Sequence, residues 1–187
     1  MTTIAAAVGK SGVVIGADSM VTAGGSQWVE VGCKLQAFDV VVGPGESRRL
    51  VLGATGSSRF TNLLRYKMRP PSDLGEDPMA YLSTDFAEEV HRVLTDAKSI
   101  DSKDGRDESD SAGLVGYVGR LFRISRDFSV TEPDRRFDAV GSGHELALGA
   151  IHALGVSDPR AAVEAALVAA SDIDPWTGGP LTFEEVA

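Results

Sequence analysis

The sequence has a single cysteine, Cys33, so an internal disulfide is excluded and we expect a reducing, cytoplasmic environment. Long apolar runs are missing too. The run near the start, Ile4–Val8, is too short for the core of a signal peptide, and no uncharged stretch is long enough to span a bilayer. We therefore expect a soluble protein that does not enter a membrane.

Basic residues are also fewer than acidic ones. The 187 residues include 18 lysines and arginines against 27 aspartates and glutamates, which gives a formal net charge of -9. Phosphate backbones are bound by basic stripes, so this composition argues against nucleic acid as a partner. Aromatic residues are sparse while alanine, valine and glycine are abundant, which is typical of closely packed layers of helices and strands.

Two pairs of strands are expected in the first third of the chain. Residues 2–8 and 13–17 are mostly apolar runs joined by a Gly/Ser turn, which predicts a β-hairpin covered on both faces. A second pair is predicted over Val29–Val42 and Arg49–Ala54, with the loop Gly43–Ser47 between them.

Helical patterns follow these strands. A first helix is predicted from Phe60 until Pro70 and Pro71 end it. Apolar residues near helical spacing predict a second helix over Asp77–Ala97. The next segment, Asp96–Ser111, is rich in Asp, Lys, Ser and Gly, and we expect an exposed loop.

Strands resume in the second half of the chain, at Gly113–Ile124 and Phe128–Thr131. A glycine-punctuated strand-to-helix turn at Ala139–His144 leads into a third helix. A fourth helix is predicted over Asp158–Ala170, and a closing strand within residues 171–187.

The expected order is therefore strands, two helices, strands, two helices and a terminal strand. Helices grouped in pairs between runs of strands favour an α+β fold in which sheet layers lie between helix layers. The chain shows no internal repeat and no linker, so we expect a single domain over residues 1–187.

Thr2 is the first candidate for chemistry. Methionine aminopeptidases remove an initiator methionine that precedes a small residue, so we expect Thr2 to become the first residue. Its free α-amine, with an ordinary pKa of about 8, would be a base beside the threonine hydroxyl. Many chains begin Met-Thr without such chemistry, so this feature alone does not identify a nucleophile.

Asp18 and Lys34 are two further candidates. Taken singly, they are a turn aspartate after an apolar run and a lysine at the edge of a strand. If both converge on Thr2, Lys34 would ease deprotonation of the hydroxyl. Asp18 would then hold the lysine, because a buried unpaired charge is costly.

Two glycine-containing turns open helices. Gly56 stands where a backbone amide could face a developing oxyanion, although a plain helix-start glycine explains it as well. Ser142, between two glycines, is open to the same two interpretations. His144 is interpreted as a helix-start residue, and no metal-ligand spacing surrounds the three histidines.

Together these segments resemble the β-subunits of the proteasome, and especially the bacterial peptidase HslV. Thr2–Ile4 and Val13–Ser19 resemble the family's opening hairpin and its aspartate, and Lys34 falls where the family carries a catalytic lysine. Ala54–Gly56 resembles the turn that supplies the oxyanion amide, and Phe137–Gly143 resembles the family's Gly-Ser-Gly turn.

The resemblance continues after the last helix. Ser171–Thr177 resembles a segment in which carbonyls at three-residue spacing hold a cation in some members, here at Ser171, Asp174 and Thr177. The ion would be Na, K or Mg, and the resemblance implies no cofactor for the chemistry itself. The ending Leu181–Val186 resembles the terminus of HslV.

The fold implied by the resemblance is the four-layer αββα sandwich of N-terminal-nucleophile hydrolases, and the implied activity is that of a threonine endopeptidase. The implied catalytic residues are Thr2, Asp18, Lys34, Gly56, Ser142 and Asp174. In this mechanism Ser142 and Asp174 orient the amine of Thr2.

The resemblance also implies partners. The family encloses its active sites in stacked rings that an ATP-driven unfoldase feeds, and HslV forms two stacked hexamers that pair with HslU. We therefore expect a homo-oligomer of stacked hexameric or similar rings, an AAA+ unfoldase of the HslU type, and unfolded polypeptides as substrates. The lack of a long propeptide before Thr2 favours the HslV branch.

Two alternatives stay open. The chain could be a catalytically silent or structural ring-forming homologue, including one encoded by a phage, that kept the fold. It could also be an amidase of the same superfamily that acts on small molecules, although the nucleophile there is more often cysteine or serine. Retention of Thr2, Asp18 and Lys34 together favours the peptidase.

Overall fold

The computed structural model describes residues 2–30, 32, 34–75, 77–103 and 105–187, so Met1 and Cys33 lie outside the described residues. A four-stranded sheet has the order β12-β1-β2-β13 and is antiparallel throughout. Its strands are β1 (Thr3–Val8), β2 (Val13–Ala17), β12 (Phe137–Gly141) and β13 (Thr182–Val186). The predicted opening hairpin and closing strand are both confirmed.

A five-stranded antiparallel sheet has the order β11-β10-β9-β6-β5. Its strands are β5 (Leu35–Gly43), β6 (Glu46–Ala54), β9 (Gly113–Tyr117), β10 (Arg120–Ile124) and β11 (Val130–Thr131). Two predicted boundaries are wrong. The strand expected from Val29 begins only at Leu35, and the loop expected over Gly43–Ser47 is a tight turn at residues 44–45, because β6 already starts at Glu46.

The other strands of the described residues form two small hairpins. The first joins β3 (Met20–Ala23) to β4 (Ser26–Val29), and the second joins β7 (Asp101–Lys103) to β8 (Arg106–Glu108). The second hairpin corrects the prediction of an exposed loop over Asp96–Ser111. His91 of the preceding helix contacts Asp107 at 2.8 Å, so the hairpin is attached to the body of the molecule.

The helices begin at identifiable caps. Helix α1 (Ser58–Lys67) starts after Ser57, whose hydroxyl accepts a hydrogen bond from the amide of Phe60. Asp77 caps a second helical run in the same way, and this run consists of α2 (Pro78–Tyr81), a π-helical turn η1 (Leu82–Phe86) and α3 (Ala87–Asp96).

The last two helices are α4 (His144–Leu154) and α5 (Pro159–Ile173). Asp158 caps α5, as its position in the sequence predicts. Helix α5 continues to Ile173, three residues beyond the predicted end at Ala170, and Asp174 is its C-cap.

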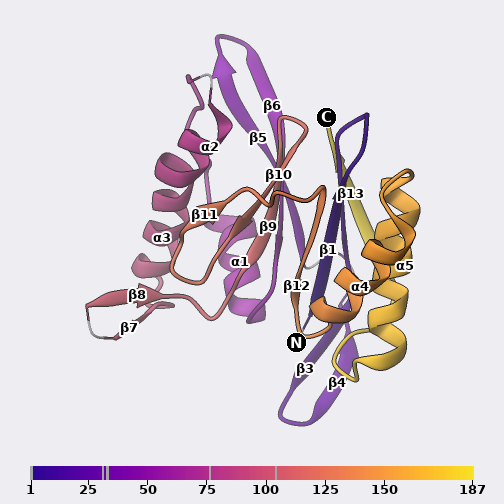
Figure 1. Ribbon diagram of the computed structural model, residues 1–187. Coiled ribbons are helices and arrows are strands. Elements are labelled where there is room, and N and C mark those ends of the chain that lie inside the picture. The colour runs from indigo at the N-terminus through magenta and orange to yellow at the C-terminus, as the bar shows by residue number, and fades with distance from the viewer. Residues whose placement is uncertain (1, 31, 33, 76, 104) are drawn as a thin grey trace.

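In the described part of the chain, three apolar clusters hold these elements together. One lies between the five-stranded sheet and helices α1–α3, one between the two sheets, and one between the four-stranded sheet and helices α4 and α5. Figure 1 shows this succession from left to right. Strand β1 shares in two clusters, because Ile4 and Ala6 face the other sheet while Ala5 and Ala7 face the helices. The mixed helix and sheet content that the sequence predicts is confirmed.

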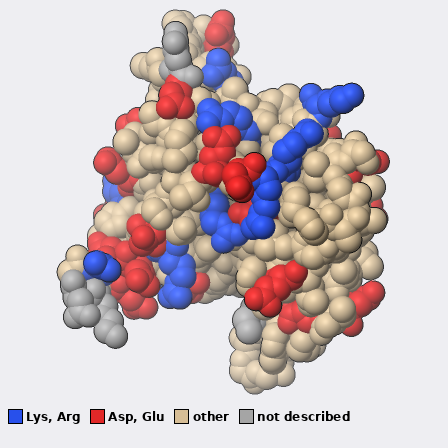
Figure 2. Space-filling view, in the orientation of Figure 1, with Lys and Arg blue, Asp and Glu red and all other residues tan. Residues whose placement is uncertain are grey.

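Among the described residues, no helix is both long and apolar enough to cross a membrane. On the face shown in Figure 2, acidic and basic side chains are interspersed over the middle of the molecule.

Candidate active site

Thr2 is held at the start of β1, where it is 4% exposed. Its carbonyl accepts a hydrogen bond of 2.8 Å from the amide of Ser142, and Thr3 pairs with Gly141 in the sheet. Gly141 has φ +104°, and a Cβ there would lie 1.9 Å from the Thr2 carbonyl oxygen. Glycine is therefore required at this turn for the start of the chain to pack so closely.

Asp18 follows β2 and is 1% exposed. One carboxylate oxygen accepts hydrogen bonds from the Thr3 amide (2.9 Å) and the Lys34 ammonium (2.7 Å). The other accepts from the amides of Met20 (3.1 Å) and Gly178 (3.0 Å). Four donors thus replace the water that the buried carboxylate has lost.

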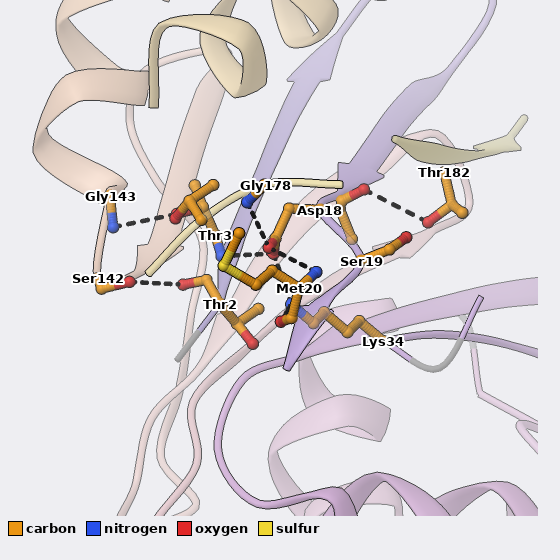
Figure 3. A network of polar contacts seen from close by, with 12 residues as sticks. Thr2, Thr3, Asp18, Ser19, Met20, Lys34, Ser142, Gly143, Gly178 and Thr182 are labelled. Atoms are coloured by element: carbon orange, nitrogen blue, oxygen red, sulfur yellow. Dashed lines mark hydrogen bonds and ion pairs between the residues drawn. The ribbon is translucent and has the colours of Figure 1, made fainter. Parts of the chain in front are cut away.

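Lys34 reaches the same point from the segment that precedes β5. Its ammonium donates to Asp18 and, at 2.6 Å, to the carbonyl of Met20. The side chains of Lys34 and Asp18 are 5% and 0% exposed, so this is a buried ion pair. Figure 3 shows Lys34 extending toward Asp18 and Met20, with Thr2 beside them.

Gly56 lies in the turn between β6 and α1. It has φ +98°, and a Cβ there would come within 1.9 Å of the hydroxyl of Ser111. The neighbouring Thr55 is fixed by hydrogen bonds to both the carbonyl and the amide of Ala112. A side chain is therefore excluded at Gly56, while its backbone is held against the segment before β9.

Thr2, Lys34 and Gly56 line one cavity of about 200 Å³. The remaining described residues around it come from the β3–β4 hairpin, from the end of β6 and from the beginning of α1 with its cap, and they are Val21, Thr22, Ala23, Trp28, Ala54, Ser57, Ser58 and Thr61. Thr2, Lys34 and Gly56, which are far apart in the sequence, thus line the same cavity.

Ser142 and Asp174 meet on the other side of Thr2. The Ser142 hydroxyl donates to Asp174 at 2.6 Å and lies 3.4 Å from the Thr2 carbonyl oxygen. The Thr177 hydroxyl also donates to Asp174 at 2.6 Å. Partial burial raises the pKa of Asp174, but the hydrogen bonds from Ser142 and Thr177 and from the Trp176 amide outweigh this, and the pKa lies below the ordinary value of 3.8.

Ser171 lies in the last turn of α5, Asp174 is the C-cap of this helix, and Thr177 follows in the next segment. The Thr177 amide donates to the Asp174 carbonyl at 3.1 Å, and the Ser171 hydroxyl is buried without a hydrogen-bond partner in the described part of the chain. Within that part, no cluster of three or more His, Cys, Asp or Glu side chains could hold a metal ion.

Several contacts of this region were not predicted. The Thr3 hydroxyl is 2.6 Å from that of Thr177 and accepts a 3.0 Å bond from the Gly143 amide, so it ties β1 to the two segments that approach it. Met20 and Gly178 act on Asp18 through their backbones. Backbone donors leave no signature in a sequence, and Thr3 differs in no way from an ordinary strand threonine.

His144 starts α4, and its Nδ1 is 2.7 Å from the Gly141 carbonyl oxygen. This contact closes the strand-to-helix turn, in agreement with the predicted helix-start role.

No protein-family model matches the sequence, and no curated protein matches it. Solved structures do match. The protein BPH of Thiobacillus denitrificans superimposes with a TM-score of 0.79 at 20% identity, over 99% of this chain and 98% of that one. HslV of Trypanosoma brucei superimposes with a TM-score of 0.64 at 22% identity, over 97% of each chain.

Anbu, the ancestral β-subunit, from Yersinia bercovieri gives a TM-score of 0.70 at 22% identity, over 98% of this chain and 81% of that one. The chain has a proteasome β-subunit fold. The proteasome-like fold places the start of β1, the end of β2 and the turn after β6 around one point, and it is the part of the predicted resemblance that these superpositions confirm.

Proposed function

We propose that this chain is a threonine-type endopeptidase, the peptidase subunit of a self-compartmentalising ATP-dependent protease that cleaves unfolded polypeptides. The observation that carries the proposal is the convergence of Thr2, the buried Lys34–Asp18 pair and the Gly56 turn on one cavity. The proteasome-like fold is consistent with it. The proposal requires Thr2 to be the first residue of the active chain.

In the proposed reaction the Thr2 hydroxyl oxygen attacks the carbonyl carbon of the scissile peptide bond. The α-amine of Thr2, directly or through a water molecule, takes the hydroxyl proton and passes it to the leaving amine. The C–N bond breaks and an ester to Thr2 remains. Water then hydrolyses this ester and restores the hydroxyl.

The negative charge that develops on the carbonyl oxygen needs a donor. The amide of Gly56 is the proposed donor, since this residue lines the cavity and its amide has no hydrogen bond to another described residue. One such donor contributes about 3 kcal/mol to catalysis in other enzymes.

Lys34 is proposed to favour the deprotonated hydroxyl through its positive charge. Asp18 holds this ammonium in place, because each charge offsets the cost of burying the other. Ser142 and Asp174 are proposed to orient the amine, since their hydrogen bonds fix the backbone of Thr2 and the turn beside it.

A monovalent or divalent cation, Na, K or Mg, is a proposed addition at Ser171, Asp174 and Thr177. Oxygen ligands suit hard cations, and the end of a helix presents carbonyls and a partial negative charge. When bound, it would supply positive charge that stabilises the segment carrying Asp174. No other cofactor is proposed.

The proposal includes a homo-oligomer of stacked hexameric or similar rings, a cytoplasmic location and an AAA+ unfoldase of the HslU type. A related structure, Anbu from Pseudomonas aeruginosa, is described as a helical assembly, so a helix of subunits is the alternative form of assembly. Residues 1–187 would be one domain, with the four-layer αββα architecture of N-terminal-nucleophile hydrolases.

The proposal is tested with chain whose mass shows Thr2 as its first residue. We expect hydrolysis of a fluorogenic peptide and a covalent adduct on Thr2 with epoxomicin, a compound with which the Thiobacillus protein has been solved. Thr2→Ala should lower kcat/KM by about 10⁴-fold or more, since the nucleophile is removed. Thr131→Ala, at an exposed strand position, is the matched control and should leave turnover unchanged.

Unchanged turnover in Thr2→Ala would refute the mechanism. Assembly without hydrolysis and without an adduct would favour the catalytically silent or structural homologue. Turnover of small amides but not of peptides would favour the amidase.

A further inference from the structure

One side of the cavity beside Thr2 is formed by the β3–β4 hairpin. Val21 of β3 and Trp28 of β4 are paired in its register, and both line the cavity. The other side is formed by Ala54 and by Ser58 and Thr61 of α1. A side chain that entered beside Thr2 would therefore contact the hairpin on one side and α1 on the other.

Charge is almost absent from this hollow. Among the described residues that line it, Lys34 has the single charged side chain, and its ammonium donates hydrogen bonds to Asp18 and to the Met20 carbonyl. The hairpin sequence, Met20–Val29, contains no Asp, Glu, Lys or Arg. It projects at the bottom of Figures 1 and 2 as an uncharged lobe. An acidic or basic side chain would lose its water here and would find, among the described lining residues, no side chain of opposite charge that is not already paired.

The volume of the cavity also limits the size of the group that it can bind. Its volume of about 200 Å³ lies below the roughly 300–1,000 Å³ of pockets for whole small-molecule ligands, so it suits one side chain. Trp28 lines it while remaining 44% exposed, so part of a large apolar ring system is still uncovered. Covering that surface with an apolar side chain would be favourable.

The position of Trp28 is fixed by contacts on both sides of it. The side-chain amide of Gln27 donates a hydrogen bond to the Pro175 carbonyl at 2.8 Å, and the backbone amide of Glu30 donates one to the Ser19 carbonyl at 2.9 Å. These bonds join the hairpin to the body of the molecule. The Trp28 side of the hollow is thus in place before a ligand arrives, which lowers the entropic cost of binding.

We propose that Trp28 is a specificity-determining residue, the wall of a subsite beside Thr2 that binds one uncharged, apolar substrate side chain of about leucine size. The subsite disfavours acidic and basic side chains. This inference rests on the proposed function for its role in turnover, but the binding step can be measured without any hydrolysis.

Binding is measured in Thr2→Ala/Trp176→Phe, which cannot use the proposed nucleophile and has Trp28 as its one tryptophan. Peptide amides identical except for a C-terminal Leu, Ala, Glu or Lys are titrated while the tryptophan emission is followed. We expect the Leu peptide to shift the emission and to bind at least about 10-fold more tightly than the other three, as a few methylene groups in an apolar pocket allow.

Turnover is measured with fluorogenic peptides that differ only at the residue donating the scissile carbonyl. Trp28→Ala should lower kcat/KM for the Leu substrate by about 10-fold or more and leave the Ala substrate within about threefold. Trp28→Phe, which keeps an aromatic face, should retain most of the preference. Trp176→Ala is the matched control, because Trp176 is 39% exposed and does not line the cavity.

A charge can also be added to the hollow. Ser58 is the first residue of α1 and is exposed, so Ser58→Asp places a carboxylate where a helix start favours it. We expect this variant to bind the Lys peptide at least about 10-fold more tightly than the unmodified subsite does.

The inference would be overturned if the unmodified subsite bound the Glu or Lys peptide as tightly as the Leu peptide, or more tightly. A preference for Leu that survives Trp28→Ala would also overturn it. Selective binding without any hydrolysis would remove the proposed function and leave the subsite. Hydrolysis without side-chain preference would support the proposed function and refute the subsite.

Discussion

Lys34 and Asp18 form a pair whose members depend on each other. Each is buried, and each would be an uncompensated charge if the other were replaced. Such pairs add little net stability against an apolar replacement of both partners, but the loss of one partner is expensive. Their arrangement is therefore better explained by the chemistry proposed for Thr2 than by stability.

Asp18→Asn should destabilise the fold by about 3–5 kcal/mol, because the Lys34 ammonium loses its counter-charge. For a chain of this size the unfolding temperature should fall by roughly 6–20 °C in calorimetry. The matched control is Glu184→Gln, which breaks an exposed pair with Arg49 and should cost at most about 1 kcal/mol. Equal shifts for the two variants would contradict the buried pairing.

Gly56→Ala should destabilise the fold more than Gly45→Ala does. Both glycines have positive φ, which costs an alanine about 1–2 kcal/mol, but only Gly56 has an atom in the way, the Ser111 hydroxyl. No atom lies within 4 Å of a Cβ at Gly45. Urea unfolding of both variants measures the difference, and Ser111→Gly in the Gly56→Ala background should recover part of it.

The catalytic candidates could be predicted from the sequence only when they were considered together, in their order along the chain. Asp18, Lys34 and Gly56 have no distinctive signal one at a time, and their order along the chain gave the hypothesis. In the structure Lys34 and Gly56 line one cavity with Thr2, and Asp18 forms an ion pair with Lys34. What the sequence could not give was the support for them. Asp18 is held largely by the backbone amides of Thr3, Met20 and Gly178. A backbone amide does not depend on the side chain, so the sequence carries no signal for these contacts.

Elements were predictable where their signals are local. The hairpin of β1 and β2 follows from two apolar runs around a glycine turn, and α5 follows from the Asp-Pro start at Asp158. Both small hairpins were missed although each has a two-residue turn signal, Gly24-Gly25 and Asp104-Gly105. Their strands are short and polar or mixed, so apolar periodicity does not reveal them.

Asp158 caps the start of helix α5. The Asp158 side chain accepts a 3.1 Å bond from the Ala161 amide, so Asp158→Ala should cost about 1 kcal/mol of stability. The matched control is Asp172→Ala at the exposed other end of the helix, where a negative charge is unfavourable and its loss should be neutral or slightly stabilising. Urea unfolding midpoints compare the two, and equal losses would mean that the cap contributes nothing.

The molecule as a whole should lose stability on acidification. Hydrogen bonds from neighbouring side chains lower the pKa of Glu89, Asp107, Asp127 and Glu132, and Asp174 is lowered despite its partial burial. A carboxylate with a lowered folded pKa contributes stability above its unfolded pKa, and loses it as the pH falls through the folded pKa. These groups should leave stability level from pH 7 to about 5 and reduce it below about 4.5.

Thermal unfolding of the intact chain and of Asp174→Asn between pH 7 and 3 measures this dependence. The variant should be less stable at pH 6, and the difference should shrink below about pH 4, where the native carboxylate takes up its proton. Asp172→Asn, which makes no hydrogen bond to the described residues, should show no such convergence. A constant difference for Asp174→Asn would show that its charge is not involved.

Strand β1 lies inside its sheet, between β12 and β2, and β13 covers the far edge of β2. Thr3 pairs with Gly141, and Val13 pairs with Val186. During synthesis on the ribosome, the β1–β2 hairpin must therefore wait for almost the entire polypeptide before its two outer neighbours, β12 and β13, exist. Its apolar strands are a natural target for chaperones throughout that interval. A translation product that stops before Gly141 would lack the strand that pairs with Thr3 and the Ser142 amide that holds the Thr2 carbonyl, so it should be inert whatever the state of its amino terminus.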